Sequence, residues 1–233
     1  MVNTDSLDCP PFVGTTVLPK ENAAISPGET SPVLSETRVV IVSDDWYYMV
    51  GLYIALLGKK GFFVEFVFVQ HVTEELFNNR SLRVDSSFRD NVLIIAVSDI
   101  SVVRRIPDFP LFRVLVLLGS PKGKDVSFLY LNVFFVSRYI SIHRLCNFLM
   151  KERIDKKIIA RKLYLTPHEQ RIVFSYFSIH DRKTLSDYLQ LRRKSISNCK
   201  MSVFRKLHVS SNAEAYLIMR AIMEVKCKTL LLL

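Results

Sequence analysis

Short polar side chains and cations share one side of a helix that the sequence predicts over residues 193–207. Lys194, Asn198, Met201 and Arg205 recur at steps of three and four residues, and this spacing places them on one helical face. Such a face can enter the major groove of DNA, where short polar and flexible groups read base edges and cations contact phosphates. A solvated basic surface is the other interpretation that this pattern leaves open.

Two kinds of DNA contact are expected from this helix and its surroundings. Three short or flexible side chains are predicted to read base edges: Ser197, Asn198 and Met201. Five cations are predicted to contact phosphates: Lys183, Lys194, Lys200, Arg205 and Lys206. The cations would supply affinity and the three other side chains sequence preference.

The opposite face of the same helix is apolar and is expected to pack inward. Its residues follow the same three- and four-residue steps: Ile196, Cys199, Val203 and Leu207. A shorter helical segment is predicted around 183–188, and the tight link at 189–192 is typical of a helix-turn-helix. The two segments together would hold the polar face outward.

Two further helices have recognisable starts. Thr166 and Glu169 have the spacing of a capping box, and Pro167 occupies the first helical position, where no amide partner is needed. Ser211 and Glu214 repeat the capping-box spacing after the predicted groove helix. Residues 165–216 therefore predict a compact helical unit.

That stretch resembles, without a gap, the DNA-binding domain of LuxR-type transcriptional regulators, which are also called FixJ- or NarL-type. The matching positions are Leu165, Thr166, Pro167, Glu169, Lys183, Leu189, Lys194, Arg205, Lys206, Leu207, Val209, Ser210, Ser211, Glu214 and Ala215. The resemblance implies a separate all-α, four-helix helix-turn-helix domain over 163–228. The stretch departs from the family at Ile179 and His208, where Gly is usual, at Cys199, where His is usual, and at Ser197, where Lys is frequent. These changes remove any DNA sequence preference borrowed from relatives.

The charge distribution supports an acidic partner for the C-terminal part. Residues 1–150 hold 14 Lys and Arg against 15 Asp and Glu, a net of −1, whereas residues 151–233 hold 18 against 7, a net of +11. The formal charge of +10 therefore belongs to one end of the chain, as an electrostatic footprint for phosphates would. Double-stranded DNA is the expected partner, and a membrane surface is the competing one.

The sequence lacks the patterns typical of membrane proteins, secreted proteins, metal-binding proteins and enzymes. No uncharged apolar run reaches the roughly 18 residues of a membrane span, and residues 1–20 lack the pattern of a signal peptide. Cys9, Cys146, Cys199 and Cys227 lack metal-ligand spacing, and no catalytic Ser, Cys or His arrangement is present. We therefore expect a bacterial cytoplasmic protein that is not an enzyme and has no cofactor, metal or membrane partner.

The preceding part of the chain predicts an α/β domain. After a proline-containing leader at 1–36, expected to be disordered, five short apolar runs follow at 39–42, 62–69, 92–97, 114–118 and 133–136. Continuous apolar runs are typical of strands buried on both faces, so residues 37–150 predict a doubly wound, parallel, five-stranded sheet. Crossover helices are expected at 46–59, 72–79 and 141–151, whereas 98–110 and 120–130 have no clear assignment. A basic linker at 151–162 leads to the helical domain.

The α/β domain resembles the receiver domain of response regulators in the order of its elements and in the residues 41–44, Gly51, Ser98 and Leu145. Receivers accept a phosphoryl group on an aspartate that follows the third strand, beside Mg²⁺ held by acids after the first. The resemblance implies a degenerate pocket, because the positions of that chemistry are occupied by Ser43, Asp44, Asp45, Ala96, Leu118 and Arg138. Ala96 stands in place of the aspartate and cannot act as a nucleophile.

Taken together, the two resemblances predict a dimeric, sequence-specific transcriptional regulator that is not controlled by aspartyl phosphorylation. Its architecture is similar to that of auxiliary regulators of the enterobacterial capsule type. A single helix-turn-helix reads one half-site, so either a homodimer or a heterodimer with another response regulator is expected. The alternative function is a protein-binding modulator that heterodimerises with a phosphorylatable response regulator and contributes little DNA contact of its own.

Overall fold

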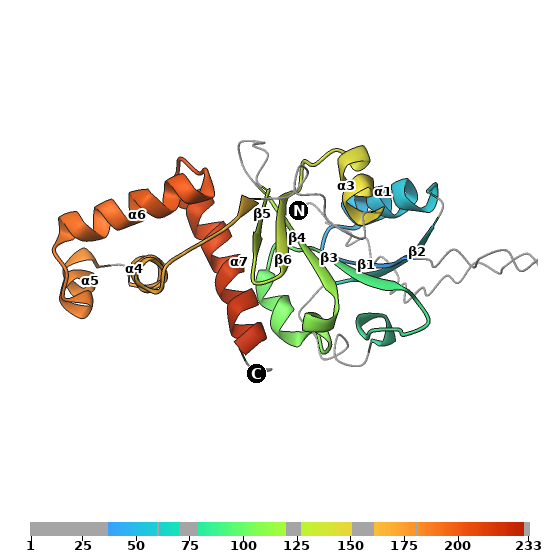
Figure 1. Ribbon diagram of the computed structural model, residues 1–233, viewed down its shortest axis with the longest axis horizontal. Helices are drawn as coiled ribbons and strands as arrows, with labels where there is room; N and C mark the ends of the chain where they lie inside the picture. The colour runs from blue at the N-terminus through green and yellow to red at the C-terminus, as the bar shows by residue number, and fades with distance from the viewer. Residues whose placement is uncertain are drawn as a thin grey trace, which may run out of the picture. The chain divides into compact units, whose positions relative to one another are not determined.

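The computed structural model describes residues 37–59, 61–69, 79–119, 127–150, 161–179 and 181–230. They form an α/β part up to Met150, a short strand at Arg161–Lys162 and a helical part from Pro167 (Figure 1). The predicted leader at 1–36 and most of the predicted linker, residues 151–160, lie outside the described residues.

Five parallel strands form the centre of the α/β part, as the apolar runs predict. They are β1 (Thr37–Ser43), β2 (Phe62–Phe68), β3 (Asp90–Ala96), β4 (Arg113–Leu118) and β6 (Val133–Ser137). Their order is β2-β1-β3-β4-β6, and neighbouring strands pair in parallel. This is the strand order of doubly wound flavodoxin-like sheets.

Two short strands extend this sheet beyond the five that the sequence predicts. β5 (Ser127–Tyr130) pairs antiparallel with β6, and β7 (Arg161–Lys162) pairs with β5. The turn between β5 and β6 has positive φ at Leu131 (47°) and Asn132 (62°). Two successive residues with positive φ are characteristic of the type I′ turn of a tight hairpin. A hairpin strand therefore occupies residues 127–130, which had no clear assignment.

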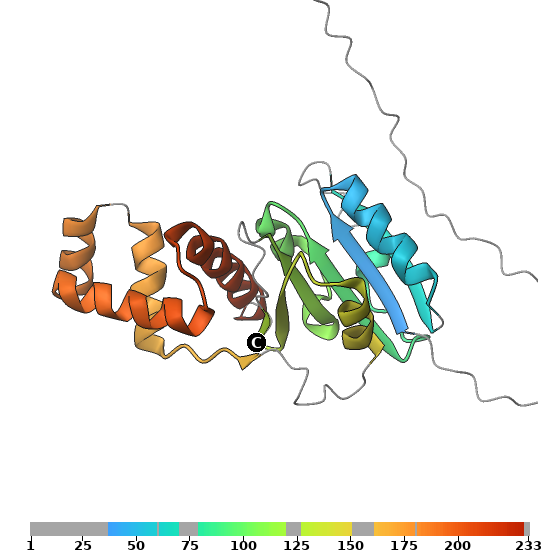
Figure 2. The ribbon, with the colours of Figure 1, turned by 90° about the horizontal axis from the view of Figure 1, so that it is seen from above.

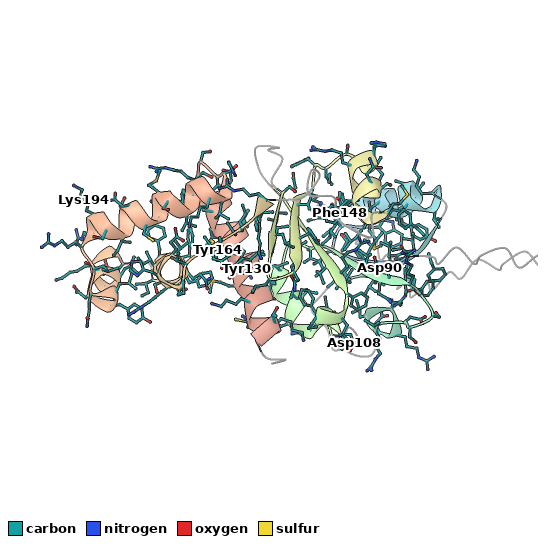
Figure 3. The ribbon with its side chains drawn as sticks, in the orientation of Figure 1. Asp90, Asp108, Tyr130, Phe148, Tyr164 and Lys194 are labelled. Carbon is teal, nitrogen blue, oxygen red and sulfur yellow. The ribbon has the colours of Figure 1, made fainter. Side chains whose placement is uncertain are left out.

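Each face of the sheet is covered by a different set of elements. α1 (Trp46–Leu57) and α3 (Ile142–Met150) pack on one face, where Phe148 contacts Phe134 of β6 (Figures 1 and 3). The other face is covered by short 3-10 helices: η1 (Arg80–Leu82), η2 (Ile100–Arg105) and η3 (Phe109–Leu111). Residues 72–78 of the expected second crossover helix lie outside the described residues.

The helical part contains the four helices that the sequence predicts. They are α4 (Pro167–Ser178), α5 (Arg182–Leu189), α6 (Arg193–Leu207) and α7 (Asn212–Leu230). α4 begins with the predicted capping box, because Thr166 accepts from the amide of Glu169 and the carboxylate of Glu169 accepts from the amide of Thr166. The hydroxyl of Ser211 accepts from the amide of Glu214 at the start of α7. No helix among the described residues is long and apolar enough to cross a membrane.

Candidate nucleic-acid interface

The groove face predicted from the sequence is an exposed surface of α6. The groove face is exposed at all five positions: Lys194, Ser197, Asn198, Met201 and Arg205. Of the predicted inner face, Ile196, Val203 and Leu207 are buried and Cys199 is half-buried. Lys194 lies at the end of α6 that is remote from α7 (Figure 3). Lys183, on the neighbouring helix α5, is also exposed. The three predicted base-reading residues therefore lie together on one solvent-facing surface.

A tight turn sets the position of α6 relative to α5. Gln190 adopts a left-handed conformation with φ of 55°, and the hydroxyl of Ser186 donates to the carbonyl of Leu191 over 2.6 Å. Leu185, Leu189 and Ile196 share a small core with Ile172 of α4. The helix-turn-helix is thus held by local hydrogen bonds and by apolar packing. Figure 2 shows α4, α5 and α6 next to one another.

Glu169 of α4 forms hydrogen bonds to the C-terminal half of α6. Besides its capping bond, its carboxylate accepts from the hydroxyl of Ser202 over 3.1 Å and from Nζ of Lys206 over 2.6 Å. Burial opposes ionisation of this carboxylate, but the hydrogen bonds from Lys206, Thr166 and Ser202 outweigh burial and lower the pKa of Glu169. The sequence indicated only a capping role for Glu169, because its link to α6 joins residues 33 and 37 positions apart.

Two of the predicted phosphate-binding lysines have partners inside the helical part. Nζ of Lys206 donates to Glu169 and to the carbonyl of Tyr164 over 3.1 Å. Nζ of Lys200 lies 3.4 Å from the hydroxyl of Tyr176, 4.9 Å above the Tyr176 ring and 5.5 Å from the Phe204 ring. An ammonium group has three donors, so Lys206 retains one for a phosphate. The other cations of α6, Arg193, Lys194 and Arg205, are exposed, whereas Lys200 and Lys206 are half-buried.

Tyr188 lies on α5 near the turn and is not among the residues predicted from the sequence to contact DNA. Its side chain is exposed although its neighbour Leu189 is buried. An exposed tyrosine hydroxyl can donate to a phosphate oxygen. The sequence could have indicated Tyr188 as a contact residue, because it is an aromatic residue on the polar side of a short helix.

The residues predicted to form a degenerate receiver pocket lie at the ends of the strands and hydrogen-bond to one another and to their neighbours. Ser43 and Ala96 are register partners at the ends of β1 and β3, and the Ser43 hydroxyl donates to the Ala96 carbonyl over 2.9 Å. The Asp44 carboxylate accepts from the amide of Ser98 over 2.6 Å. Ala96 is buried and has no side-chain oxygen. The ends of β1 and β3 are thus joined directly at Ala96, the residue that the sequence resemblance predicts in place of the phosphoryl-accepting aspartate.

Arg138, at the same edge of the sheet, joins the end of β6 to the start of α1. Its guanidinium donates to Asp45 over 2.7 Å and lies 4.1 Å from the centre of the Tyr48 ring. The Tyr48 hydroxyl donates to the carbonyl of Arg138 over 3.3 Å, and burial is the main cause of the raised pKa of Tyr48. Leu118, at the end of β4, is buried in the apolar core.

The residues of this pocket do not fit the Mg²⁺ that receivers bind. Magnesium needs several oxygen ligands in near-octahedral geometry. Oδ2 of Asp45 is bound to Arg138 and Ala96 offers no side-chain oxygen, which leaves Oδ1 of Asp44, buried and without a hydrogen-bond partner, as an unused acceptor. Among the described residues, no group of three His, Cys, Asp or Glu side chains could hold a metal ion.

Comparisons with known proteins found similarity at the level of structure. No protein-family model matches the chain, and no curated protein matches it. RcsB from Salmonella enterica serovar Typhimurium, solved on the rprA promoter with a phosphomimetic, is similar with 17% identity over 79% of this chain and 98% of RcsB, at a TM-score of 0.48. A structure of two RcsB dimers on two parallel DNAs has 16% identity over 80% of this chain and 98% of RcsB, at a TM-score of 0.48. Full-length FixJ from B. japonicum has 15% identity over 80% of this chain and 97% of FixJ, at a TM-score of 0.30.

Proposed function

We propose that this chain is a sequence-specific DNA-binding transcriptional regulator that works as a dimer in the bacterial cytoplasm. The exposed polar face of α6 carries the proposal, because Ser197, Asn198 and Met201 lie together on a helix whose opposite face is buried. A helix of this kind can lie in the major groove with its polar face on the base edges.

Asn198 is the residue that we assign to direct base reading. Its side-chain amide can donate and accept at the same time, as the N6 and N7 edge of adenine requires. Ser197 can bond to any base, and Met201 supplies an apolar contact for a thymine methyl group. Lys194 and Arg205 flank these side chains on the same exposed face and are assigned to phosphates, with Lys183 of α5.

Lys200 and Lys206 are assigned to phosphate contacts of a different kind. Both ammonium groups are held by residues of the helical part, Lys200 over aromatic rings and Lys206 against Glu169. A cation held in place before DNA arrives loses less side-chain entropy on binding than a mobile one. These two lysines would therefore fix the register of α6 on the DNA backbone.

Control of this activity by aspartyl phosphorylation is not part of the proposal. Ala96 has no group that could attack a phosphoryl donor, and Arg138 is bound to Asp45 and Tyr48. The α/β part would therefore serve assembly, since two copies are needed to read two half-sites.

Selection of duplexes from a randomised DNA pool by the full-length protein tests the proposal. We expect an enriched motif with two half-sites about 10 base pairs apart, and loss of one base preference in each half-site for the Asn198→Ala variant. An enriched pool without a motif would overturn sequence-specific binding. A single half-site, completed only when a second regulator is added, would favour the heterodimeric modulator.

A further inference from the structure

α1 is apolar on all sides, although only one of its sides is buried. Its twelve residues include no charged side chain, and Met49, Leu52 and Leu56 face the sheet. Tyr47 is 88% exposed and Ile54 is 62% exposed on the opposite side. A helix that is apolar all round is ordinarily covered on every side. The outer side of α1 therefore has the composition of an interface.

Large and small residues alternate along this outer side. Tyr47, Gly51, Ile54 and Gly58 follow one another at steps of four, three and four residues, which places them on one stripe. A Cβ atom added at Gly51 or at Gly58 would meet nothing within 4 Å. The two glycines are therefore open recesses between two projecting side chains.

This stripe is complementary to a second copy of itself. When two α1 helices meet in antiparallel orientation about a two-fold axis, each Tyr47 faces Gly58 of the other copy and each Ile54 faces Gly51 of the other copy. Large side chains thus enter recesses at four positions, and a two-fold interface needs such self-complementarity. We propose that the outer face of α1 is the homodimerisation surface of this protein, with a second copy of the chain as its occupant.

The charges at this surface are compatible with pairing of two identical copies. The stripe carries no charge, and residues 1–150, which include α1, have a net formal charge of only −1, so two copies can meet there without strong repulsion. The same antiparallel arrangement brings Trp46, 41% exposed, opposite Lys59 of the other copy. A lysine over an indole face is an attractive pair.

The exposed apolar area of α1 is large enough for a reversible, weakly associating dimer. Trp46, Tyr47, Ile54 and Leu57 together expose about 500 Å² on each copy, given that a large aromatic side chain buries roughly 150–250 Å². If all of this area were covered, two copies would bury about 1,000 Å², which is the size of a small, weak interface. That this dimer serves to bind a second DNA half-site rests on the proposed function. The assignment of α1 as a dimer surface does not depend on that function.

Sedimentation equilibrium of the full-length protein without DNA, over a concentration series, tests the surface. We expect a monomer–dimer equilibrium for the natural chain. Gly51→Leu fills the recess that Ile54 of the other copy needs, so we expect its dimer dissociation constant to rise at least about 10-fold. Its melting temperature at a fixed low concentration should not fall, because the added side chain meets open space and leucine favours a helix over glycine.

A matched pair of variants separates this surface from general exposure of apolar groups. Ile54→Asp should abolish the dimer, whereas Leu111→Asp, at an apolar residue of η3 that is 71% exposed, should leave it intact. A natural chain that stays monomeric at about 100 μM, or a Gly51→Leu dimer of unchanged affinity, would overturn the proposal. DNA binding of Gly51→Leu, measured separately on one half-site, distinguishes failure of this surface from failure of the DNA interface.

Discussion

Nζ of Lys206 lies 2.6 Å from Oε2 of Glu169, which joins the last turn of α6 to the first turn of α4. The two side chains are 32% and 11% exposed, so the pair is largely shielded from solvent. A lysine predicted from the sequence to contact DNA thus also holds the helix that carries the residues proposed to read bases. Lys206 therefore both holds α6 against α4 and contributes a positive charge to the surface of α6.

We predict that Lys206 and Glu169 are energetically coupled. Lys206→Ala and Glu169→Gln should each lower the free energy of unfolding by about 1–3 kcal/mol, because each leaves a partly buried polar group without its charged partner. The double variant should lose less than the sum of the two single losses. Urea unfolding of the four proteins measures the coupling, and additive losses would show that the pair acts on stability independently.

The lowered pKa of Glu169 predicts a pH dependence of stability. A carboxylate whose pKa is lower in the folded state stabilises the fold above its unfolded pKa, near 4.5, and loses this contribution as the pH falls through its folded value. The stability difference between the natural chain and Glu169→Gln should therefore be present at pH 7 and decrease below about pH 4.5. A difference that remains constant between pH 7 and pH 3 would contradict the assignment.

His208 ends α6 in a conformation that favours glycine. Its φ of 56° lies in the left-handed region, and its amide donates to the carbonyl of Arg205 over 3.2 Å. His208→Gly should therefore be more stable than His208→Ala by about 1 kcal/mol. Comparison with Ala removes the contribution of the imidazole, which lies 2.6 Å from Arg161 through Nε2. Thermal unfolding measures the difference, and equal stability of the two variants would argue against backbone strain at this position.

The hydrogen bonds at Asp45 and the absence of a side-chain oxygen at Ala96 predict resistance to phosphorylation. Incubation with acetyl phosphate and Mg²⁺ should give no phosphoryl adduct in the intact mass, because Ala96 has no nucleophilic oxygen and Asp45 is bound to Arg138. An intact response regulator serves as the positive control. An adduct mapped to Asp44, Asp45 or Asp99 would show that the pocket retains transfer chemistry.

Features determined by local sequence were predictable, and those determined by distant residues were not. The capping box at Thr166 and the apolar stripe of α6 are local, so the helical part follows from the sequence. The hairpin strand β5 was not predicted, because its turn at Leu131 and Asn132 lacks the glycine that usually marks such turns. The position of Lys200 over Tyr176 joins residues 24 positions apart, and no periodicity indicates it.

In the α/β part, too, some features could be predicted from local sequence and others could not. Its parallel strands were predictable because strands buried on both faces are continuous apolar runs. The exposure of Tyr47 and Ile54 could not be read from the sequence, because a uniformly apolar helix gives no sign of which side faces the core. The bond between Arg138 and Asp45 joins residues 93 positions apart and required the folded sheet.

Fluorescence anisotropy of the full-length protein on a selected and a scrambled duplex, across a salt series, tests DNA binding through α6 most directly. We predict tighter binding to the selected duplex, with log affinity falling linearly with log salt. Lys194→Ala should reduce that slope by about one on both duplexes, whereas Asn198→Ala should reduce discrimination by about 1–3 kcal/mol with an unchanged slope. Equal affinity for the two duplexes, or affinity that neither variant changes, would contradict the account.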